Sequence, residues 1–258
     1  MLISDEAINA ARGITSINTP STTRIARAIA MEILGGVLKP GDRISGEEES
    51  LERFGVSRTV LREAVKILDA KGFVTAKPKV GTRVRDRQNW NFLDPEVLVW
   101  RIAVGLDADL LQTLREARLA VEPFAARLSA QRASLSDLAE MEASVRLMDE
   151  AVRNRTLFAA ADLRFHRAVA ASTGNFLLGS FSSIVEIALV CATLLLPLED
   201  ESLRSEAVHR HAELLEAIVD HDGDRASQLM SAMIAFGGEV GELSSKPNRR
   251  RPGESRVS

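Results

Sequence analysis

The sequence predicts a mainly α-helical protein with an N-terminal winged helix-turn-helix and a C-terminal all-helical bundle. In the first 86 residues, three helical patterns precede two short strand patterns, and a tight turn at Gly55 separates the last two helices. From Asp107 to Leu243 apolar residues recur only at the helical spacing. Between residues 56 and 87 there are 9 Lys or Arg against 3 Asp or Glu, although the chain carries a net charge of −3. This basic segment suggests a polyanionic partner, although charge alone is more typical of a solvated helix face.

The composition favours a cytoplasmic protein that has no membrane partner. Its 258 residues are 45% hydrophobic, which is enough for one large domain or two ordinary ones. The single cysteine, Cys191, excludes an intramolecular disulfide and fits a reducing compartment. The N-terminus has no basic run followed by an apolar run, so no secretory signal is expected. The most apolar stretch, residues 184–198, contains Glu186 and is shorter than the ~20 residues that span a bilayer. We interpret it as a buried helix.

The N-terminal domain is predicted over residues 21–86, after a flexible segment at 1–20. Its helices are recognised by apolar residues at helical spacing and by the glycines that end them. The expected elements are a helix that Ser21 caps and Gly35-Gly36 ends, a short helix near 47–54, a third helix at 57–71, and strands at 73–77 and 82–85.

The C-terminal domain is predicted over residues 107–243, after a linker at 87–106 and before a disordered tail at 244–258. The linker mixes aromatic with polar residues, which indicates a segment that docks onto a domain. Six helices with short connections predict a bundle. They are expected to start at 107 and at the capping-box-like Ser134, and to cover about 156–172, 176–196, 203–221 and 224–242. The first is expected to turn inward Leu110, Leu111, Leu114, Val121, Phe124 and Leu128.

The helix at 57–71 has an apolar stripe and a basic face beside it. Leu61, Ala64, Val65 and Leu68 fall at positions i, i+3, i+4 and i+7, which predicts that this stripe faces the core. The outward residues are predicted to bind DNA, because they lie in the N-terminal half, where recognition helices meet base edges. An arginine can take both acceptors of guanine in the major groove or clamp a phosphate. These outward residues are Arg58, Thr59, Arg62 and Lys66.

The predicted hairpin that follows adds to this basic surface. Lys77, Lys79 and Arg83 would contact the DNA backbone or minor groove, and Gly81 would permit a tight turn close to the duplex. Two alternatives remain open from the residues alone. One is a three-helix module that binds protein, and the other is an architectural protein that binds DNA without sequence preference.

Three stretches make this chain resemble the GntR family of bacterial regulators. They are GVLKPGDRI, FGVSRTVLREAVKILDAKGFV and VGTRV in the predicted wing. The C-terminal half resembles the helical ligand-sensing (FCD) domain of the FadR subgroup, so the likeness covers about residues 20–243. It implies that Arg58 and Arg62 are the main DNA contacts. The chain departs from the family pattern at Glu48, where some members have a DNA-contacting arginine, and at Val60, where proline is usual. The operator sequence therefore cannot be carried over.

A second constellation lies in the helical half. Asp162 and His166 are four residues apart and share a helix face, and His211 belongs to a later helix. Taken alone, such a pair is more often a surface ion pair. The resemblance implies instead a divalent metal held by an aspartate, a histidine four residues later and two further histidines. Met233 stands where the last histidine is expected, which leaves two alternatives. Either zinc, nickel or manganese has three protein ligands, with water or effector completing the site, or the site holds no metal. His209 is the weaker alternative to His211.

The resemblance also implies an effector site in the helical domain. Arg118 stands where the subgroup points an arginine into its pocket, and Asn175 matches the asparagine at the pocket edge; Asp162, His166 and His211 would line the same pocket. Alternatively, Arg118 forms a surface ion pair with Glu122, and Asn175 is a helix N-cap. The linker and Met233 resemble a branch of the subgroup that responds to sugar acids, which implies an aldonate effector.

We therefore expect a homodimeric transcription factor, most simply a repressor that leaves its operator DNA when a small carboxylate binds the helical domain. The alternatives are an activator that responds to another carboxylate and a metallohydrolase that uses the Asp/His/His set to activate water.

Overall fold

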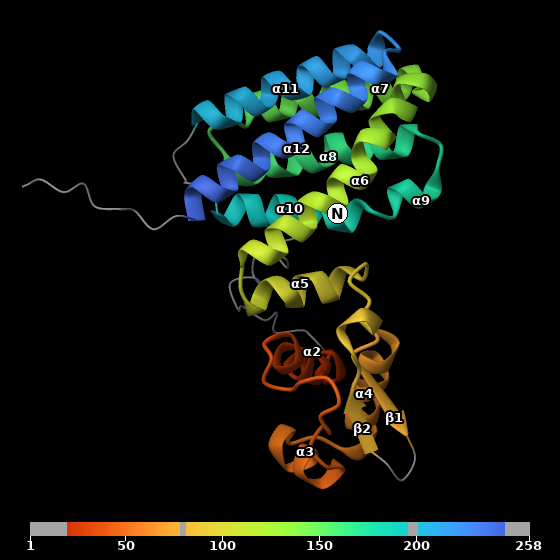
Figure 1. Ribbon diagram of the computed structural model, residues 1–258, viewed down its shortest axis with the longest axis vertical. Coiled ribbons are helices and arrows are strands. Elements are labelled where there is room, and N and C mark those ends of the chain that lie inside the picture. Colours follow the sequence, from red (N-terminus) through yellow and green to blue (C-terminus); the bar gives the residue numbers. More distant parts are fainter. Residues whose placement is uncertain (1–19, 78–80, 196–200, 246–258) are drawn as a thin grey trace, which may run out of the picture.

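The computed structural model describes residues 20–77, 81–195 and 201–245. Figure 1 shows a smaller N-terminal domain, a larger helical C-terminal domain and one helix, α5, between them. The predicted fold class is confirmed: a winged helix-turn-helix precedes an all-helical domain. Most of the flexible segment predicted at 1–20 and of the tail predicted at 244–258 lies outside the described residues.

The N-terminal domain follows the predicted element order. Its elements are α2 (Ser21–Leu34), α3 (Glu47–Phe54), α4 (Arg58–Ala70), β1 (Val74–Lys77) and β2 (Gly81–Val84). Ser21 does not cap α2, contrary to the prediction. Pro20 occupies the N-cap position without a side-chain hydrogen bond, and its carbonyl accepts from the N–H of Arg24. Gly55 ends α3 in the left-handed conformation, φ +62°, which glycine adopts without steric cost.

One apolar core holds the three helices and the hairpin together. Ile29 of α2, Leu61 and Leu68 of α4, Phe73 and Val84 are all buried in it. The two strands pair antiparallel, with Val74 opposite Val84 and Lys77 opposite Gly81. Because the core face of α4 packs on α2 and β1, its opposite face is left for solvent.

Helix α5 (Pro95–Val104) occupies much of the segment predicted as a linker. Asp94 caps it by accepting hydrogen bonds from the N–H groups of the next turn, and Pro95 starts it, a position at which proline is favoured. The helix is buried on both sides. Val97 and Trp100 belong to the N-terminal core, whereas Leu98 and Ile102 belong to a core of the C-terminal domain. α5 is therefore shared between the two domains.

The C-terminal domain packs its helices around two apolar cores. One core lies between α6, α7, α8, α11 and α12, and the other between α5, α6, α8 and α10. The predicted helix at 176–196 is wrong in one respect, because the chain turns at Ser180 and divides it into α9 and α10. The helices are α6 (Ala108–Arg132), α7 (Leu135–Glu150), α8 (Arg155–Ser172), α9 (Phe176–Gly179), α10 (Ser182–Leu195), α11 (Glu201–Val219) and α12 (Gly223–Ser245).

Phe124 faces solvent, which corrects the prediction that it points inward. It is 52% exposed, and it shares its stripe of α6 with Ala120 and Arg127, which are also exposed. The neighbouring Pro123 and Ala125 are buried instead. The helix packs on α8, α10, α11 and α12, so several of its faces are covered. The spacing of apolar residues therefore does not show which face of α6 stays exposed.

The apolar stretch predicted as a buried helix at 184–198 is helical up to Leu195, where α10 ends, and residues 196–198 lie outside the described part of the chain. Ile184, Val190 and Cys191 of α10 are all nearly inaccessible. Within the described parts of the chain, no helix is both long enough and apolar enough to cross a membrane.

Candidate functional sites

The outer face of α4 carries the basic residues that the sequence predicts. Ser57 caps the helix by accepting from the N–H of Val60, which fixes its start beside Arg58. Leu61, Ala64 and Leu68 are buried. Arg58, Thr59, Arg62 and Lys66 are exposed, with 63% of the Arg58 side chain and 71% of the Arg62 side chain accessible. The two guanidinium groups stand one turn apart on an open helix face, which is the geometry needed to enter a major groove.

The acidic neighbours of these arginines hold them only loosely. The carboxylate of Glu47 lies 3.8 Å from Arg58 and 3.9 Å from Arg62, and Glu48 lies 3.9 Å from Arg58. These separations exceed hydrogen-bond length, and exposed pairs of this kind contribute about 0–1 kcal/mol. Lys66 makes a shorter pair of 2.8 Å with Glu63 on the same helix. The arginines can therefore exchange Glu47 for a phosphate or a base.

The described part of the wing contributes Arg83 and Gly81. Arg83 is exposed, and its Nη1 donates to the carbonyl of Gly41 at 2.7 Å, so the guanidinium is held at the base of the hairpin. Gly81 has φ +94°, and a Cβ there would meet the Arg43 side chain at 3.0 Å. Lys77 ends β1 opposite Gly81, and Lys79 lies outside the described residues.

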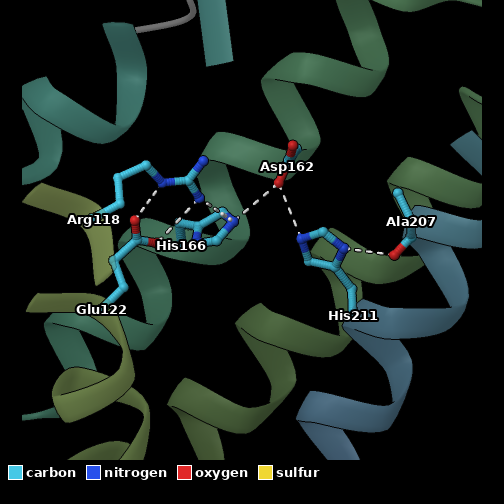
Figure 2. A network of polar contacts seen from close by, with 6 residues as sticks. All are labelled: Arg118, Glu122, Asp162, His166, Ala207 and His211. Atoms are coloured by element: carbon cyan, nitrogen blue, oxygen red, sulfur yellow. Dashed lines mark hydrogen bonds and ion pairs between the residues drawn. The ribbon is translucent and has the colours of Figure 1, made fainter. Parts of the chain in front are cut away.

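A buried cluster in the C-terminal domain joins the second set of predicted residues. Asp162 and His166 come from α8, His211 from α11, and Arg118 from α6 (Figure 2). Asp162 Oδ1 lies 3.2 Å from His166 Nε2 and 3.0 Å from His211 Nε2. The other ring nitrogen of His211 lies 2.7 Å from the carbonyl of Ala207. His209, by contrast, is exposed and pairs with Glu213, so the choice of His211 is supported by its position.

Arg118 and Glu122 complete this cluster from α6. Their expected ion pair exists, with Nε 2.5 Å from Oε1, but it is buried rather than on the surface. Arg118 Nη2 also lies 3.4 Å from His166 Nε2 (Figure 2). Glu122 Oε2 approaches His166 Nδ1 at 2.6 Å, although the angle is outside hydrogen-bond geometry. The sequence predicts Glu122 only as an ion-pair partner of Arg118; the signal that points to its place in the cluster is the i, i+4 spacing from Arg118.

The charges of this cluster stabilise one another. Burial works to raise the pKa of Glu122, but the Arg118 and His166 cations outweigh it and lower the pKa to about 2. Burial likewise opposes ionisation of Asp162, but hydrogen bonds from His166 and His211 hold its pKa well below the usual range. For His166 burial acts to lower the pKa, and the Glu122 and Asp162 carboxylates raise it to about 9. In the absence of any bound ion, His166 therefore balances the two carboxylates together with Arg118.

The donor atoms of Asp162, His166 and His211 fit a divalent transition metal. One ligand atom from each lies within 4.8 Å of the others, and no other His, Cys, Asp or Glu group of this kind occurs in the described residues. Both ring nitrogens of His211 face oxygen atoms: Nδ1 faces the carbonyl of Ala207 and Nε2 faces the Asp162 carboxylate. A neutral imidazole can donate to only one of them, so a second proton or a metal cation at Nε2 is needed to satisfy both contacts. Met233 is buried in the core, and Met230, one turn earlier on α12, lines the adjoining cavity.

A cavity adjoins the cluster. It is partly open to solvent. Its wall, from α6, α8, α10 and α12, is mainly apolar and includes the polar groups of Arg118, Glu122, His166 and Arg167. Of the residues predicted to line the effector pocket, Arg118 and His166 do so, whereas Asp162, His211 and Asn175 are not among the lining residues. Asn175 Oδ1 accepts from the N–H of Leu177 and caps α9. The structure thus places Asn175 in the N-cap alternative left open by the sequence.

An exposed basic helix in a winged helix-turn-helix, joined to a helical domain in which a charged cluster lies beside a cavity, is the arrangement of a DNA-binding regulator with a separate effector domain. The chain belongs to the gntR family of bacterial regulatory proteins: residues 21–84 match that family, and residues 113–236 match the FCD domain.

Two curated relatives cover most of the chain. The galactonate operon transcriptional repressor of Escherichia coli K12 is 34% identical over 214 residues, which are 83% of this chain and 93% of that protein. The HTH-type transcriptional regulator YieP of the same organism is 35% identical over 217 residues, 81% and 90% of the two chains. A solved structure titled "Lar controls the expression of the Listeria monocytogenes agr system and mediates virulence" aligns with a TM-score of 0.61 at 18% identity, over 89% of this chain and 99% of that one, and supports the fold.

These comparisons decide between the regulator and the enzyme. Both matching families and the relatives are transcriptional regulators, so this protein is a regulator and not an enzyme. The metallohydrolase alternative is not supported.

Proposed function

We propose that the protein is a homodimeric repressor that acts in the cytoplasm and leaves its operator when a small carboxylate binds the helical domain. The observation that carries this proposal is the buried cluster of Arg118, Glu122, Asp162, His166 and His211 beside a cavity. Charged groups are rarely buried without partners or a ligand, and here they converge from three helices on one point.

A divalent metal would be held by Asp162, His166 and His211. With both imidazoles neutral, one guanidinium and one divalent ion face two carboxylates, which leaves one positive charge beside the cavity. A carboxylate effector neutralises that charge. When bound, the metal supplies a Lewis-acidic position for a carboxylate or hydroxyl oxygen, and Arg118 supplies a planar pair of donors. The three-ligand set leaves positions open for such a ligand.

The effector class proposed is an aldonate, such as galactonate. Support comes from the relative that is named for the galactonate operon and from the cationic end of the cavity. Within the cavity, Arg118 and His166 are the residues proposed to meet the carboxylate.

Operator recognition is assigned to α4 and the wing. Arg58 and Arg62 would contact base edges, and Thr59, Lys66, Lys77, Lys79 and Arg83 would contact the backbone, with Gly81 allowing close approach. A two-fold dimer would present two copies of α4 to successive major grooves about one helical turn apart. For release, the effector must bind more tightly to the arrangement of the two domains that does not fit DNA.

A thermal-shift screen tests the effector part of this proposal. The purified protein is heated with a panel of sugar acids and other small carboxylates, with Zn²⁺, Ni²⁺ or Mn²⁺ added, or with a chelator. We expect at least one aldonate to raise the melting temperature, and the chelator to abolish that shift.

Two histidine variants of α11 provide the matched control. His211→Ala removes a buried ligand, whereas His209→Ala removes an exposed imidazole two residues away. The shift should disappear in the first and persist in the second. A shift that survives in His211→Ala would rule out this cluster as the effector site.

A further inference from the structure

The C-terminal end of the recognition helix carries a buried lysine that the DNA-binding role does not use. Lys71 follows the last residue of α4, and only 10% of its side chain is accessible. Lysine is almost never buried without partners. Its Nζ lies 2.6 Å from Asp94 Oδ2 and 2.7 Å from Glu96 Oε2, and 5.3 Å from the centre of the Trp100 ring. All three partners lie at the start of α5 or on it.

The charges of Lys71, Asp94 and Glu96 also stabilise the two helix ends that meet at this ion pair. Lys71 stands at the negative end of α4, and Asp94 and Glu96 stand at the positive end of α5, so each favours its own helix as well as its ion-pair partner. Burial acts to lower the pKa of Lys71, but hydrogen bonds to Asp94 and Glu96 outweigh it and raise the pKa. The ammonium therefore remains charged in its buried position.

The backbone strengthens this junction. The carbonyl of Lys71 accepts a hydrogen bond from the N–H of Asn91 at 2.9 Å. Gly72 has φ +80°, and a Cβ there would lie 2.0 Å from the carbonyl oxygen of Asn89. Phe73 packs between the rings of Trp90 and Trp100, with centroid distances of 5.3 Å and 6.2 Å. The end of α4 and the start of α5 are therefore joined by a backbone hydrogen bond, ion pairs and ring contacts.

The other face of α5 belongs to the C-terminal domain. Leu98 and Ile102 pack in the core that contains Ile184 and Val185 of α10, and those two α10 residues also line the cavity. A movement of α10 would therefore displace α5 directly, through apolar contact. Figure 1 shows α5 between the two domains, next to both α10 and α2.

We propose that Lys71 is a positioning residue that fixes the angle between the recognition helix and α5, and through α5 the orientation of the DNA-binding domain on the effector domain. Without it, the two domains stay folded but sample a wider range of relative orientations. In a dimer, that range reduces the fraction of molecules whose two recognition helices have the spacing that the operator requires.

Distance measurement by electron spin resonance tests this directly. Spin labels are attached at Glu52→Cys on α3 and Glu150→Cys on α7, two exposed positions in different domains. The native Cys191 does not compete, because burial shields its thiol and raises the pKa to about 12. Labelled chains are diluted with unlabelled protein so that only distances within one chain are recorded. The measurement needs neither effector nor DNA, so its outcome is independent of the proposed effector.

Lys71→Met keeps the apolar stem on Trp100 and removes the charge. We expect a broader distance distribution than in the wild type, while far-UV circular dichroism stays the same. Affinity for a duplex that the wild-type protein selects from a random library should fall about tenfold, which corresponds to ~1.4 kcal/mol. Binding to a single half-site should fall much less. A distance distribution as narrow as in the wild type would overturn the proposal.

A second variant keeps the test decisive if Lys71→Met does not fold. Glu96 is half exposed, so Glu96→Lys opposes Lys71 with a like charge without burying a new group. It should broaden the same distribution, and an unchanged distribution would also overturn the proposal. Arg146→Met, which breaks an exposed ion pair within α7, is the control and should leave the distribution unchanged.

Discussion

The recognition helix and the buried cluster of the C-terminal domain use the same residue types in opposite ways. On α4, Arg58 and Arg62 are mostly exposed, and their carboxylate neighbours lie 3.8–3.9 Å away. In the C-terminal domain, Arg118 is buried with its carboxylate partner 2.5 Å away. An external polyanion requires cations that are hydrated and mobile until it arrives. A small ligand in a largely apolar cavity requires cations that are already oriented.

The difference also separates stability from function. An exposed, loosely paired arginine contributes little to the free energy of folding, so its removal is expected to lower DNA affinity rather than stability. A buried pair is different, because removal of one partner leaves the other charge without compensation in a low-dielectric interior. The comparison predicts a large loss of stability in the buried cluster and changes in DNA affinity on α4. A further test concerns how the two regions communicate.

Glu122→Gln should be the most destabilising of these changes. It keeps the shape of the side chain but leaves Arg118 and His166 without their nearest anion, which should cost about 3–5 kcal/mol. Urea unfolding followed by circular dichroism measures the loss. The matched control is Glu142→Gln in the exposed i, i+4 pair with Arg146, which should change stability by less than about 0.5 kcal/mol. Equal effects for the two variants would contradict the contrast between the regions.

Arg62→Ala should lower DNA affinity without lowering stability. Loss of a base-contacting arginine costs about 1–3 kcal/mol per half-site and reduces the salt dependence of binding by about one contact. Fluorescence anisotropy with the selected duplex over a series of salt concentrations measures both quantities. Arg146→Ala, far from α4 on α7, serves as the control. If Arg62→Ala bound with the wild-type affinity and salt slope, the assignment of α4 as the recognition helix would be wrong.

Glu48→Ala should have a small effect of the opposite sign. Its side chain is 92% exposed beside Arg58, so it repels phosphates and competes for the guanidinium. We expect affinity for the selected duplex to rise about threefold at low salt, and the gain to vanish at high salt as screening grows. Glu49→Ala, one residue further along α3, points about 100° away and should change affinity less. A loss of affinity in Glu48→Ala would instead indicate that Glu48 contacts the DNA.

The sequence predicts the fold class and the exposed face of α4 well, for identifiable reasons. The stripe of Leu61, Ala64 and Leu68 determines which face of α4 is buried, and the outward arginines follow from it. Periodicity fails where a helix is covered on several sides, as at Phe124, and where a short turn interrupts an apolar run, as at Ser180. The start of α2 is also predicted one residue too late, because Pro20 and not Ser21 occupies the N-cap position.

The buried cluster could be predicted only in part. Asp162, His166 and His211 were found through a resemblance, because a single i, i+4 pair does not reveal burial. The depth of Arg118 and Glu122 depends on α6 packing against α8, which is a long-range property of the fold. The same holds for α5: its mixed aromatic and polar sequence indicated docking, but not that its two faces join two different cores.

The most direct test of the whole account is effector-dependent release of DNA. The complex of the protein with the selected duplex is titrated with galactonate, and then with the carboxylates that raise its melting temperature, in the presence of the divalent ion that supports that shift. The account predicts release from the wild type and retention by His166→Ala, with His209→Ala behaving as the wild type. Equal release from His166→Ala, or no release by any carboxylate in the panel, would contradict the claim that the buried cluster controls the recognition helix.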